Sequence, residues 1–311
     1  MAKKTYVGVN NIARNVSKMY VGVNGVARKI KKAYVGVNGV AKQVYEAPLK
    51  IVTFNGGTEQ EIYDMLEAHY KGVIDISNYW SVGDSRTIHL SAMEATYVGE
   101  SHRAQDMIIE IVDFKHDDLS TPINGITKAA VTIACKNCLR DATVSDTDGL
   151  HNTEMGYINS TDSYINGWHG SNRRNWCNNV FYNALPQYIK MGVKEVQKNA
   201  HYWNSNKVLV PDISKNYVFL PSYNELKGSN SLAPNDGSKY TRYTTSSNLI
   251  KLPKATSSDI SSNYYTRSSL TEKDFYGVDG TKYVLIISRA NTDLDISSAS
   301  TAQGISPMFC M

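Results

Sequence analysis

The first 47 residues repeat one alternating pattern of apolar and polar positions three times. Near-copies of a 14-residue unit begin at Tyr6, Tyr20 and Tyr34, and each opens with the letters YVGVN. The second and third copies continue into Asn24-Gly25 and Asn38-Gly39, a dipeptide that supplies both positive-φ positions of a two-residue type I′ turn. The pattern therefore predicts three antiparallel β-hairpins.

A turn at residues 10–11 would fix the register of the first hairpin. From the turn outward, the opposed residues would be Val9 with Ile12, Gly8 with Ala13, Val7 with Arg14 and Tyr6 with Asn15. One face is then aliphatic, and the other carries Tyr, Gly and Ala. Because one hairpin cannot bury both faces, we expect the Tyr ring of one repeat to lie over the Gly–Ala strip of the next. We also expect chains to associate as a homo-oligomer, such as a trimer.

The periodicity changes at Pro48. Thr58-x-x-Glu61 is a capping box, which predicts a helix over 58–71 that ends at Gly72. Its apolar face includes Ile62, Met65 and Leu66, and His69 beside them is expected to pack rather than to bind a ligand. We interpret this helix as a joint. The predicted organisation is a hairpin module over 1–47, a linker with a short helix over 48–76 and a domain over 77–311.

Short aliphatic and β-branched runs predict the strands of the domain, which are 86–90, 107–114, 130–134, 217–220 and 283–287. Helical spacing predicts a helix over about 175–190, and Pro186 should kink or divide it. Residues 222–269 are rich in Ser, Thr, Asn and Tyr, which predicts extended surface loops. The expected fold class is α+β.

Charge separates the hairpin module from the rest of the chain. Residues 1–47 hold nine Lys and Arg against one Glu, whereas the remaining residues hold 24 Lys and Arg against 28 Asp and Glu. A basic module points to an acidic partner, which could be a protein surface, nucleic acid or a polyanionic envelope. A basic solvated sheet whose Lys residues block edge aggregation is an equal alternative. The candidate attachment residues are Tyr6, Tyr20, Tyr34, Arg28 and Lys29.

Tyr outnumbers Phe by 21 to 6. Tyr together with Ser, Asn and Gly is typical of adaptable binding surfaces, and this favours recognition over catalysis. No Ser/His/Asp order, phosphate loop or paired catalytic Glu stands out, so we do not expect an enzyme. The candidate ligand-binding residues lie in the C-terminal loops and are Tyr240, Tyr243, Tyr264, Tyr265, Arg267, Tyr276, Asn291 and Asp293.

Four cysteines do not form a disulfide framework for a chain of this size. Cys135-x-x-Cys138 has no second ligand pair, so we expect buried thiols and no metal or cofactor. The sequence has no signal peptide and no run of 18 apolar residues, so we expect synthesis in a reducing cytoplasm without membrane insertion.

Several segments, in order, resemble a domain of unknown function that is common in phages and prophages of Gram-positive bacteria. That domain is similar to the C-type-lectin-like fold, which phage adhesins share with formylglycine-generating enzymes. The resemblance covers about residues 77–311, and the hairpin repeat resembles N-terminal modules of phage structural proteins. The segments are WSVGDSRTIHLSA from Trp80, IVDFKHDDLSTPINGITKAAVTI from Ile111, GWHGSNRRNWCNN from Gly167, YVFLPSYNEL from Tyr217, YYTRSS from Tyr264 and GISPMFC from Gly304.

The resemblance implies a C-type-lectin-like domain behind a β-hairpin module, in a virion protein. Residues 1–47 would bind other virion proteins, and the C-terminal domain would bind a host-surface glycan or protein, which makes nucleic acid an unlikely partner. The alternatives are a purely structural tail, baseplate or capsid-fibre subunit and, more distantly, an enzyme that acts on the cell wall or generates formylglycine. The calcium-binding tripeptides of lectins and the redox cysteine motif are absent from this sequence.

The resemblance also predicts that residues 304–310 form a buried terminal strand, and that loops within 222–269 and 291–301 are exposed. Asp113, His116, Asp117 and Asp118 could hold a divalent cation, but we favour a hydrogen-bonded loop. The Trp and Arg residues of the family motif could stack on a sugar, a base or a peptide aromatic. We expect the motif residues instead to brace the fold, with an Arg buried against carboxylates such as Asp117 or Asp118. The motif residues are Trp80, Asp117, Asp118, Trp168, Arg173, Arg174 and Trp176.

Overall fold

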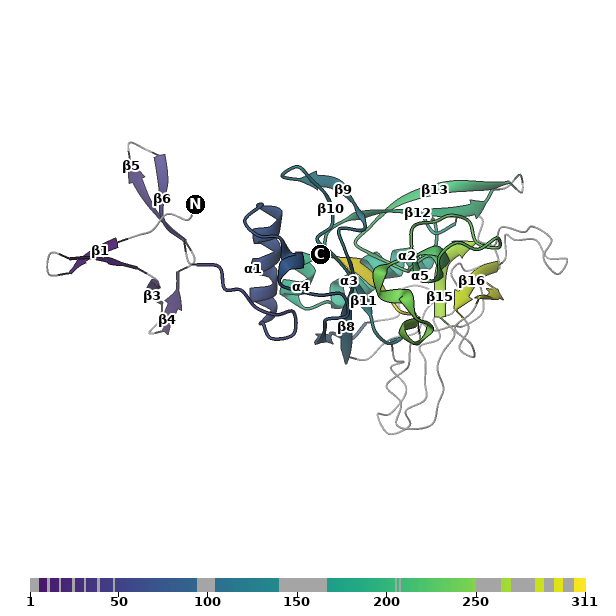
Figure 1. The fold of residues 1–311 in the computed structure, drawn as a ribbon, viewed down its shortest axis with the longest axis horizontal. Coiled ribbons are helices and arrows are strands. Elements are labelled where there is room, and N and C mark those ends of the chain that lie inside the picture. Colours follow the sequence, from purple (N-terminus) through teal and green to yellow (C-terminus); the bar gives the residue numbers. More distant parts are fainter. Residues whose placement is uncertain are drawn as a thin grey trace, which may run out of the picture. The chain divides into compact units, whose positions relative to one another are not determined.

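The chain divides after Ile51 into two units, 1–51 and 52–311. The computed structural model describes residues 6–9, 12–16, 18–23, 26–30, 32–37, 40–46, 48–93, 104–139, 167–204, 206, 208–249, 264–269, 283–287, 294–298 and 305–311. Figure 1 shows the secondary structure of both units.

Each N-terminal repeat forms one antiparallel hairpin. The pairs are β1 (Tyr6–Val9) with β2 (Ile12–Asn15), β3 (Tyr20–Val23) with β4 (Val26–Lys29), and β5 (Lys32–Val37) with β6 (Val40–Glu46). Val9 lies opposite Ile12 and Tyr6 opposite Asn15 in the first hairpin, so the predicted register is confirmed.

The predicted stacking of Tyr over a neighbouring Gly–Ala strip is wrong for the described side chains within one chain. The hairpins form three separate two-stranded sheets. Tyr20 and Tyr34 are each 56% exposed, and the space over Gly36 is open to 4 Å. Each described hairpin pairs only its own two strands, and Val21, Val35, Val37 and Val40 are also exposed.

The C-terminal strand lies inside a five-stranded antiparallel sheet of the second unit. Its order is β14 (Val218–Phe219), β18 (Met308–Cys310), β11 (Val131–Cys135), β8 (Gln105–Phe114) and β7 (Ser85–Leu90). Phe309 and Cys310 are fully buried, which confirms the predicted terminal strand. The sheet places the end of the chain in the core.

Two further antiparallel sheets complete the β-structure. One has the order β10 (Ile126–Lys128), β9 (Asp118–Ile123), β12 (Val196–Trp203) and β13 (Leu209–Asn216). The other has the order β15 (Tyr264–Ser269), β16 (Tyr283–Ile287) and β17 (Leu294–Ser298). All five predicted strands are present. The long β12–β13 hairpin was not predicted, and β17 occupies part of a predicted loop.

The helix predicted as a joint belongs to the second unit. It is α1 (Glu59–Tyr70), it begins with the predicted capping box at Thr58, and Ile62 and Leu66 are buried. A Cβ added to Gly192 of α4 would lie 3.3 Å from Leu66 Cδ1, so the two helices are in close contact. Trp80 Nε1 also donates a hydrogen bond of 2.9 Å to the carbonyl of Val52. Residues 52–76 are therefore part of the domain core and not a linker.

The predicted helix around Pro186 is divided, because Leu185 adopts an extended conformation before the proline. Its parts are α2 (Asn172–Trp176), a π-helical turn η2 (Cys177–Phe181), α3 (Tyr182–Ala184) and α4 (Gln187–Gly192). The remaining short helices are η1 (Ile76–Asn78), α5 (Tyr223–Lys227), η3 (Thr241–Thr244) and η4 (Ser246–Leu249). The described fold is α+β, built mostly from antiparallel sheets.

A chain that begins at Val52 should unfold cooperatively at the same denaturant concentration as the corresponding transition of the full chain. A chain that begins at residue 77 should be much less stable, because burying each of Ile62, Met65 and Leu66 contributes about 1.5–3 kcal/mol. Urea titration followed by circular dichroism measures both. Equal midpoints for the two shortened chains would contradict the placement of α1 in the domain.

Candidate functional site

A lysine lies on the inward face of β12. Val196, Lys198 and Ala200 alternate with exposed residues along this strand, and Lys198 is only 2% exposed. Its ammonium donates to an oxygen of Asp117, to Glu225 Oε1 at 3.0 Å and to the Tyr240 hydroxyl at 2.7 Å. All three N–H groups of the ammonium therefore have an acceptor, as a buried charge requires.

Glu225 joins Lys198 to a second buried cation. Ser222 and Glu225 form a capping box at the start of α5, so the carboxylate is held by its own helix. Arg267 of β15 donates to both Glu225 oxygens, at 2.6 and 2.7 Å. Its other N–H bonds reach the carbonyls of Asn199, Leu220 and Asp236, so all five donors of the guanidinium are used.

Asp117 completes a cluster of two anions and two cations, which we call the ion cluster: Asp117, Lys198, Glu225 and Arg267. Asp117 also accepts from Thr132 Oγ1 at 2.5 Å and from Cys310 Sγ at 3.2 Å. Burial would raise the pKa of Asp117, but the charge and hydrogen bond of Lys198 outweigh it and lower the pKa to about 2. The ion cluster is thus ionised, neutral in sum and closed to solvent.

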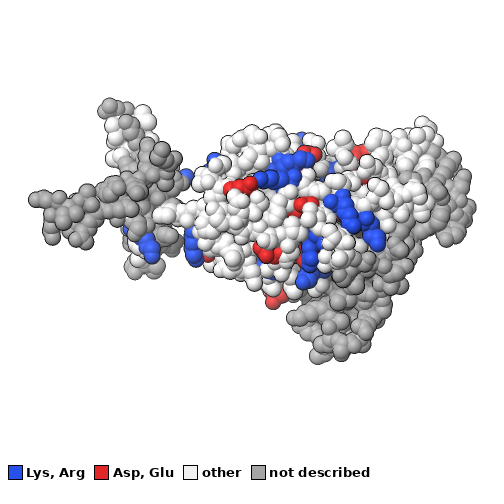
Figure 2. All heavy atoms as spheres, in the orientation of Figure 1, with Lys and Arg blue, Asp and Glu red and all other residues white. Residues whose placement is uncertain are grey.

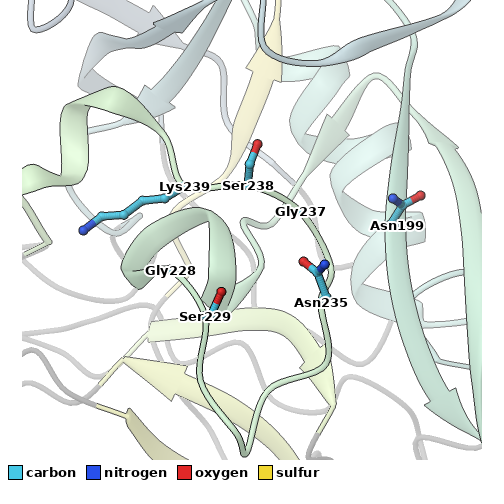
Figure 3. A pocket seen from close by; sticks show the side chains of 7 residues that line it. All are labelled: Asn199, Gly228, Ser229, Asn235, Gly237, Ser238 and Lys239. Atoms are coloured by element: carbon cyan, nitrogen blue, oxygen red, sulfur yellow. The ribbon is translucent and has the colours of Figure 1, made fainter.

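A surface pocket lies on the loop that covers the ion cluster. It has a volume of about 470 Å³, and its lining residues are Asn199, Gly228, Ser229, Asn235, Gly237, Ser238 and Lys239. Gly237 has φ +148°, and a Cβ there would lie 3.0 Å from Glu225 Oε1, so the loop rests directly on the cluster. In Figure 3 the Lys239 side chain extends away from the other lining residues, which leaves amides and hydroxyls around the pocket.

The loop between β8 and β9 places a histidine against this pocket. His116 Nδ1 lies 3.0 Å from Asp113 Oδ2, and His116 Nε2 lies 3.2 Å from the Ser238 hydroxyl. The imidazole ring packs on Tyr240, with ring centroids 4.4 Å apart. Asp113 also accepts from the backbone N–H of Thr241 at 2.9 Å. The sequence predicted a hydrogen-bonded loop at Asp113 and His116, and this is confirmed.

Three predicted ligand-binding residues are buried, so the predicted exposure of loops within 222–269 is wrong at these positions. Tyr240 donates and accepts hydrogen bonds with the ion cluster, Arg267 is a member of it, and Tyr243 is equally buried. The Ser- and Tyr-rich composition reflects buried hydrogen bonding here and not surface adaptability. Tyr264 and Tyr265 lie in β15, but their side chains are outside the described residues, as are Tyr276, Asn291 and Asp293.

The family-motif residues mostly brace the core, as predicted. Trp80, Trp168, Arg173 and Trp176 are buried, and Trp168 Nε1 donates to Asn216 Oδ1 at 3.2 Å. The expected pairing of an Arg with Asp117 or Asp118 is wrong for the described contacts. Arg174 donates hydrogen bonds to Asn216 and to backbone carbonyls. Asp117 instead forms an ion pair with Lys198, and Asp118 forms one with Lys128 at the surface.

The structure places the attachment candidates in the hairpins. Tyr6, Tyr20, Arg28, Lys29 and Tyr34 all lie in strands, and only Tyr20 and Tyr34 have described side chains. All four cysteines are buried thiols, as predicted. Within the described ranges, no group of three His, Cys, Asp or Glu could hold a metal ion. Among the described helices, none has the length and apolar character needed to cross a membrane.

The sequence interpretation missed Lys198, Glu225, Asp236 and Ser238. Two features of the sequence could have identified Lys198 and Glu225. Lys198 stands at an apolar position of the alternation from Val196 to Ala200, and Ser222-x-x-Glu225 repeats the capping-box spacing recognised at Thr58. Asp236 and Ser238 carry no such local signal. Asp236 is buried and contacts His201 and Ser268, each at 2.7 Å, and burial raises its pKa.

Replacing Lys198 with Met should lower the free energy of unfolding by about 3–5 kcal/mol, because it leaves two buried carboxylates without their shared cation. Lys215→Met on the exposed side of β13 is the matched control and should change it by less than about 0.5 kcal/mol. Equilibrium urea unfolding gives both numbers. A Lys198→Met protein as stable as the control would refute the role of the ion cluster.

Stability should fall as acid protonates Asp117. Its pKa is lowered from 3.8 in the unfolded chain to about 2, so its contribution is present above pH 4 and is lost as the pH falls towards 2. The contribution is on the order of 2 kcal/mol. Asp118→Asn should keep this pH dependence, and Asp117→Asn should flatten it. Parallel curves of unfolding free energy against pH for wild type and Asp117→Asn would count against this account.

Comparison with known proteins gives one match. No curated protein and no solved structure matches the chain significantly. A family model matches residues 136–311, more than half of the chain, and this region contains Lys198, Glu225, Ser238 and Arg267. The chain therefore belongs to the family described as "Domain of unknown function (DUF6273)".

Proposed function

We propose that this chain is a phage virion protein with an attachment module and a displayed recognition domain, a fibre-like adhesin or decoration protein. The observation that carries the proposal is the division into two units of different character. The first is a set of basic hairpins with exposed apolar side chains, and the second is a domain with an internal ion cluster and a polar pocket.

The hairpin module has the surface expected of an attachment segment. Tyr20, Tyr34 and Val40 expose large apolar groups, which a stable free surface would not favour. Nine Lys and Arg against one Glu make an acidic virion partner the best match in charge. Association of several chains, for example in a trimer, would also bury these exposed apolar groups. Assembly in the bacterial cytoplasm and release within the virion complete the proposal.

The second unit has the surface expected of a displayed domain. Figure 2 shows Lys and Arg interspersed with Asp and Glu over its described face, so no single charge dominates there. The pocket offers Asn199, Ser229 and Asn235, whose amides and hydroxyls suit a ligand rich in hydroxyl groups, such as a host-surface glycan. We further propose that the fold is C-type-lectin-like, which the buried terminal strand and the loop-borne pocket support.

A second candidate function is a purely structural subunit of the tail, baseplate or capsid fibre. Val208 and Ile213 expose aliphatic side chains at the β12–β13 hairpin, at 53% and 64%. Such groups could pack on a neighbouring virion protein, and the domain would then need no host ligand.

The two candidates differ in what deletion of residues 1–51 does. We expect particles to lose the shortened protein, because the attachment surface is gone. We expect the purified second unit to bind cells of the bacterium that propagates the phage, and Asn235→Ala to weaken this binding at least about tenfold. Asn206→Ala, an exposed Asn outside the pocket, is the control. Binding by neither the second unit nor the full chain would favour the structural subunit.

Particles that retain the protein after the deletion would overturn attachment through the hairpins. Western blotting of purified particles and flow cytometry with labelled protein measure the two outcomes separately.

A further inference from the structure

We propose that Ser238, His116 and Asp113 form a hydrolytic triad, and that the pocket binds an acyl ester of a hydroxyl-rich molecule and cleaves it. The inference goes beyond recognition, and it does not require that the protein belong to a virion. It also differs from the expectation that the chain is not an enzyme.

Ser238, His116 and Asp113 are linked by hydrogen-bond distances in the order that nucleophilic catalysis requires: nucleophile, base, carboxylate. The Ser238 hydroxyl lies 3.2 Å from His116 Nε2, and His116 Nδ1 lies 3.0 Å from Asp113 Oδ2. Hydroxyl, imidazole and carboxylate thus form one hydrogen-bonded line through the two different ring nitrogens, as in serine hydrolases on unrelated folds. Ser238 is exposed and lines the pocket, so its hydroxyl is accessible to a ligand.

The surroundings set the tautomer of the histidine. Burial would raise the pKa of Asp113, but hydrogen bonds from His116, Thr241 and Phe114 lower it overall, so the carboxylate is ionised at neutral pH. An ionised Asp113 can only accept, and His116 Nδ1 must therefore carry the proton. Nε2 is then free to accept the proton of Ser238 whenever the ring is neutral.

The ion cluster fixes the position of this histidine. The His116 ring packs on Tyr240, and the hydroxyl of Tyr240 bonds to Lys198 and Asp117 beneath it. A second hydrogen bond to Asp113, from Thr241 Oγ1 at 3.1 Å, holds the carboxylate from the other side. His116, the proposed base, is thus held by Tyr240 on its ring face and by Asp113 at Nδ1, so little conformational entropy is lost when it accepts a proton.

Residues that line the pocket carry N–H groups that a developing oxyanion could use. Among the described residues, the backbone N–H groups of Ser238 and Lys239 donate to no protein acceptor, and the side-chain amide of Asn235 lies in the same lining. Such donors stabilise the tetrahedral intermediate of acyl transfer. The described lining residues are Asn, Ser, Gly and Lys, with no large apolar side chain among them, so a short acyl group such as acetyl on a sugar hydroxyl fits best.

The chemistry needs no cofactor. Ser238 Oγ bonds to the ester carbonyl carbon while its proton moves to His116 Nε2, and the bond from that carbon to the alcohol oxygen breaks as the alcohol takes the proton. Water then attacks the acyl-serine, passes one proton through His116 to Oγ, and releases the carboxylic acid. Ser238 and His116 act as catalytic residues, and Asp113 is a positioning residue.

The test uses the full chain with two probes, 4-nitrophenyl acetate for turnover and a fluorophosphonate for covalent labelling. We expect the fluorophosphonate to modify Ser238, located by peptide mass spectrometry, and Ser238→Ala to lower turnover at least about 100-fold. Ser91→Ala, an exposed serine away from the pocket, is the control and should retain both signals. Because Ser238 is exposed, the alanine variant should fold, and circular dichroism verifies this.

Two further variants separate catalysis from a structural hydrogen bond. In the wild type, turnover should rise with pH as the imidazole of His116 loses its proton, and His116→Gln should abolish this rise. Asp113→Asn should lower turnover and shift the pH at which turnover rises. Wild type that neither labels nor turns over either probe above the Ser238→Ala variant would overturn the proposal. So would labelling that maps to any other serine.

Discussion

Burial of four full charges is the constraint on which the second unit depends. Asp117, Lys198, Glu225 and Arg267 are at most 5% exposed, and each must find its counter-charge and hydrogen bonds within the protein. The requirement can be met only if the start of β9, strand β12, helix α5 and strand β15 converge on one point. The cluster therefore specifies one arrangement of segments more sharply than apolar packing would.

The accessible chemistry is built on this buried cluster. Gly237 rests against Glu225, and His116 rests against Tyr240, so the pocket loop and the histidine are both supported from within. The Tyr- and Ser-rich segments have the composition of binding loops, but Tyr240 and Arg267 are buried because they bond within the cluster. Short stretches of the same segments, such as residues 238–239, reach the surface. Neighbouring residues of the same loop thus differ in exposure: Asp236 is buried, and Ser238 is exposed at the pocket.

The family match begins in the middle of the folded unit. It starts at residue 136, but β18 pairs with β11 before that point, and Asp117 supplies a carboxylate to the ion cluster. The matched segment therefore lacks three of the five strands of the central sheet, β7, β8 and β11, and one of the two carboxylates of the ion cluster. The structural domain extends back to Val52, where α1 and Trp80 close the core. The hairpins before it form a separate unit.

The sequence by itself determined the elements whose causes are local. The hairpin registers, the capping box at Thr58 and the break at Pro186 each depend on residues a few positions apart, and each is found as predicted. The tertiary structure decided which polar side chains are buried and which meet. Lys198 joins Asp117 across 81 positions and Ser238 joins His116 across 122, and no periodicity links such residues. Their chemistry depends on burial and distance, which exist only once the sheets have formed.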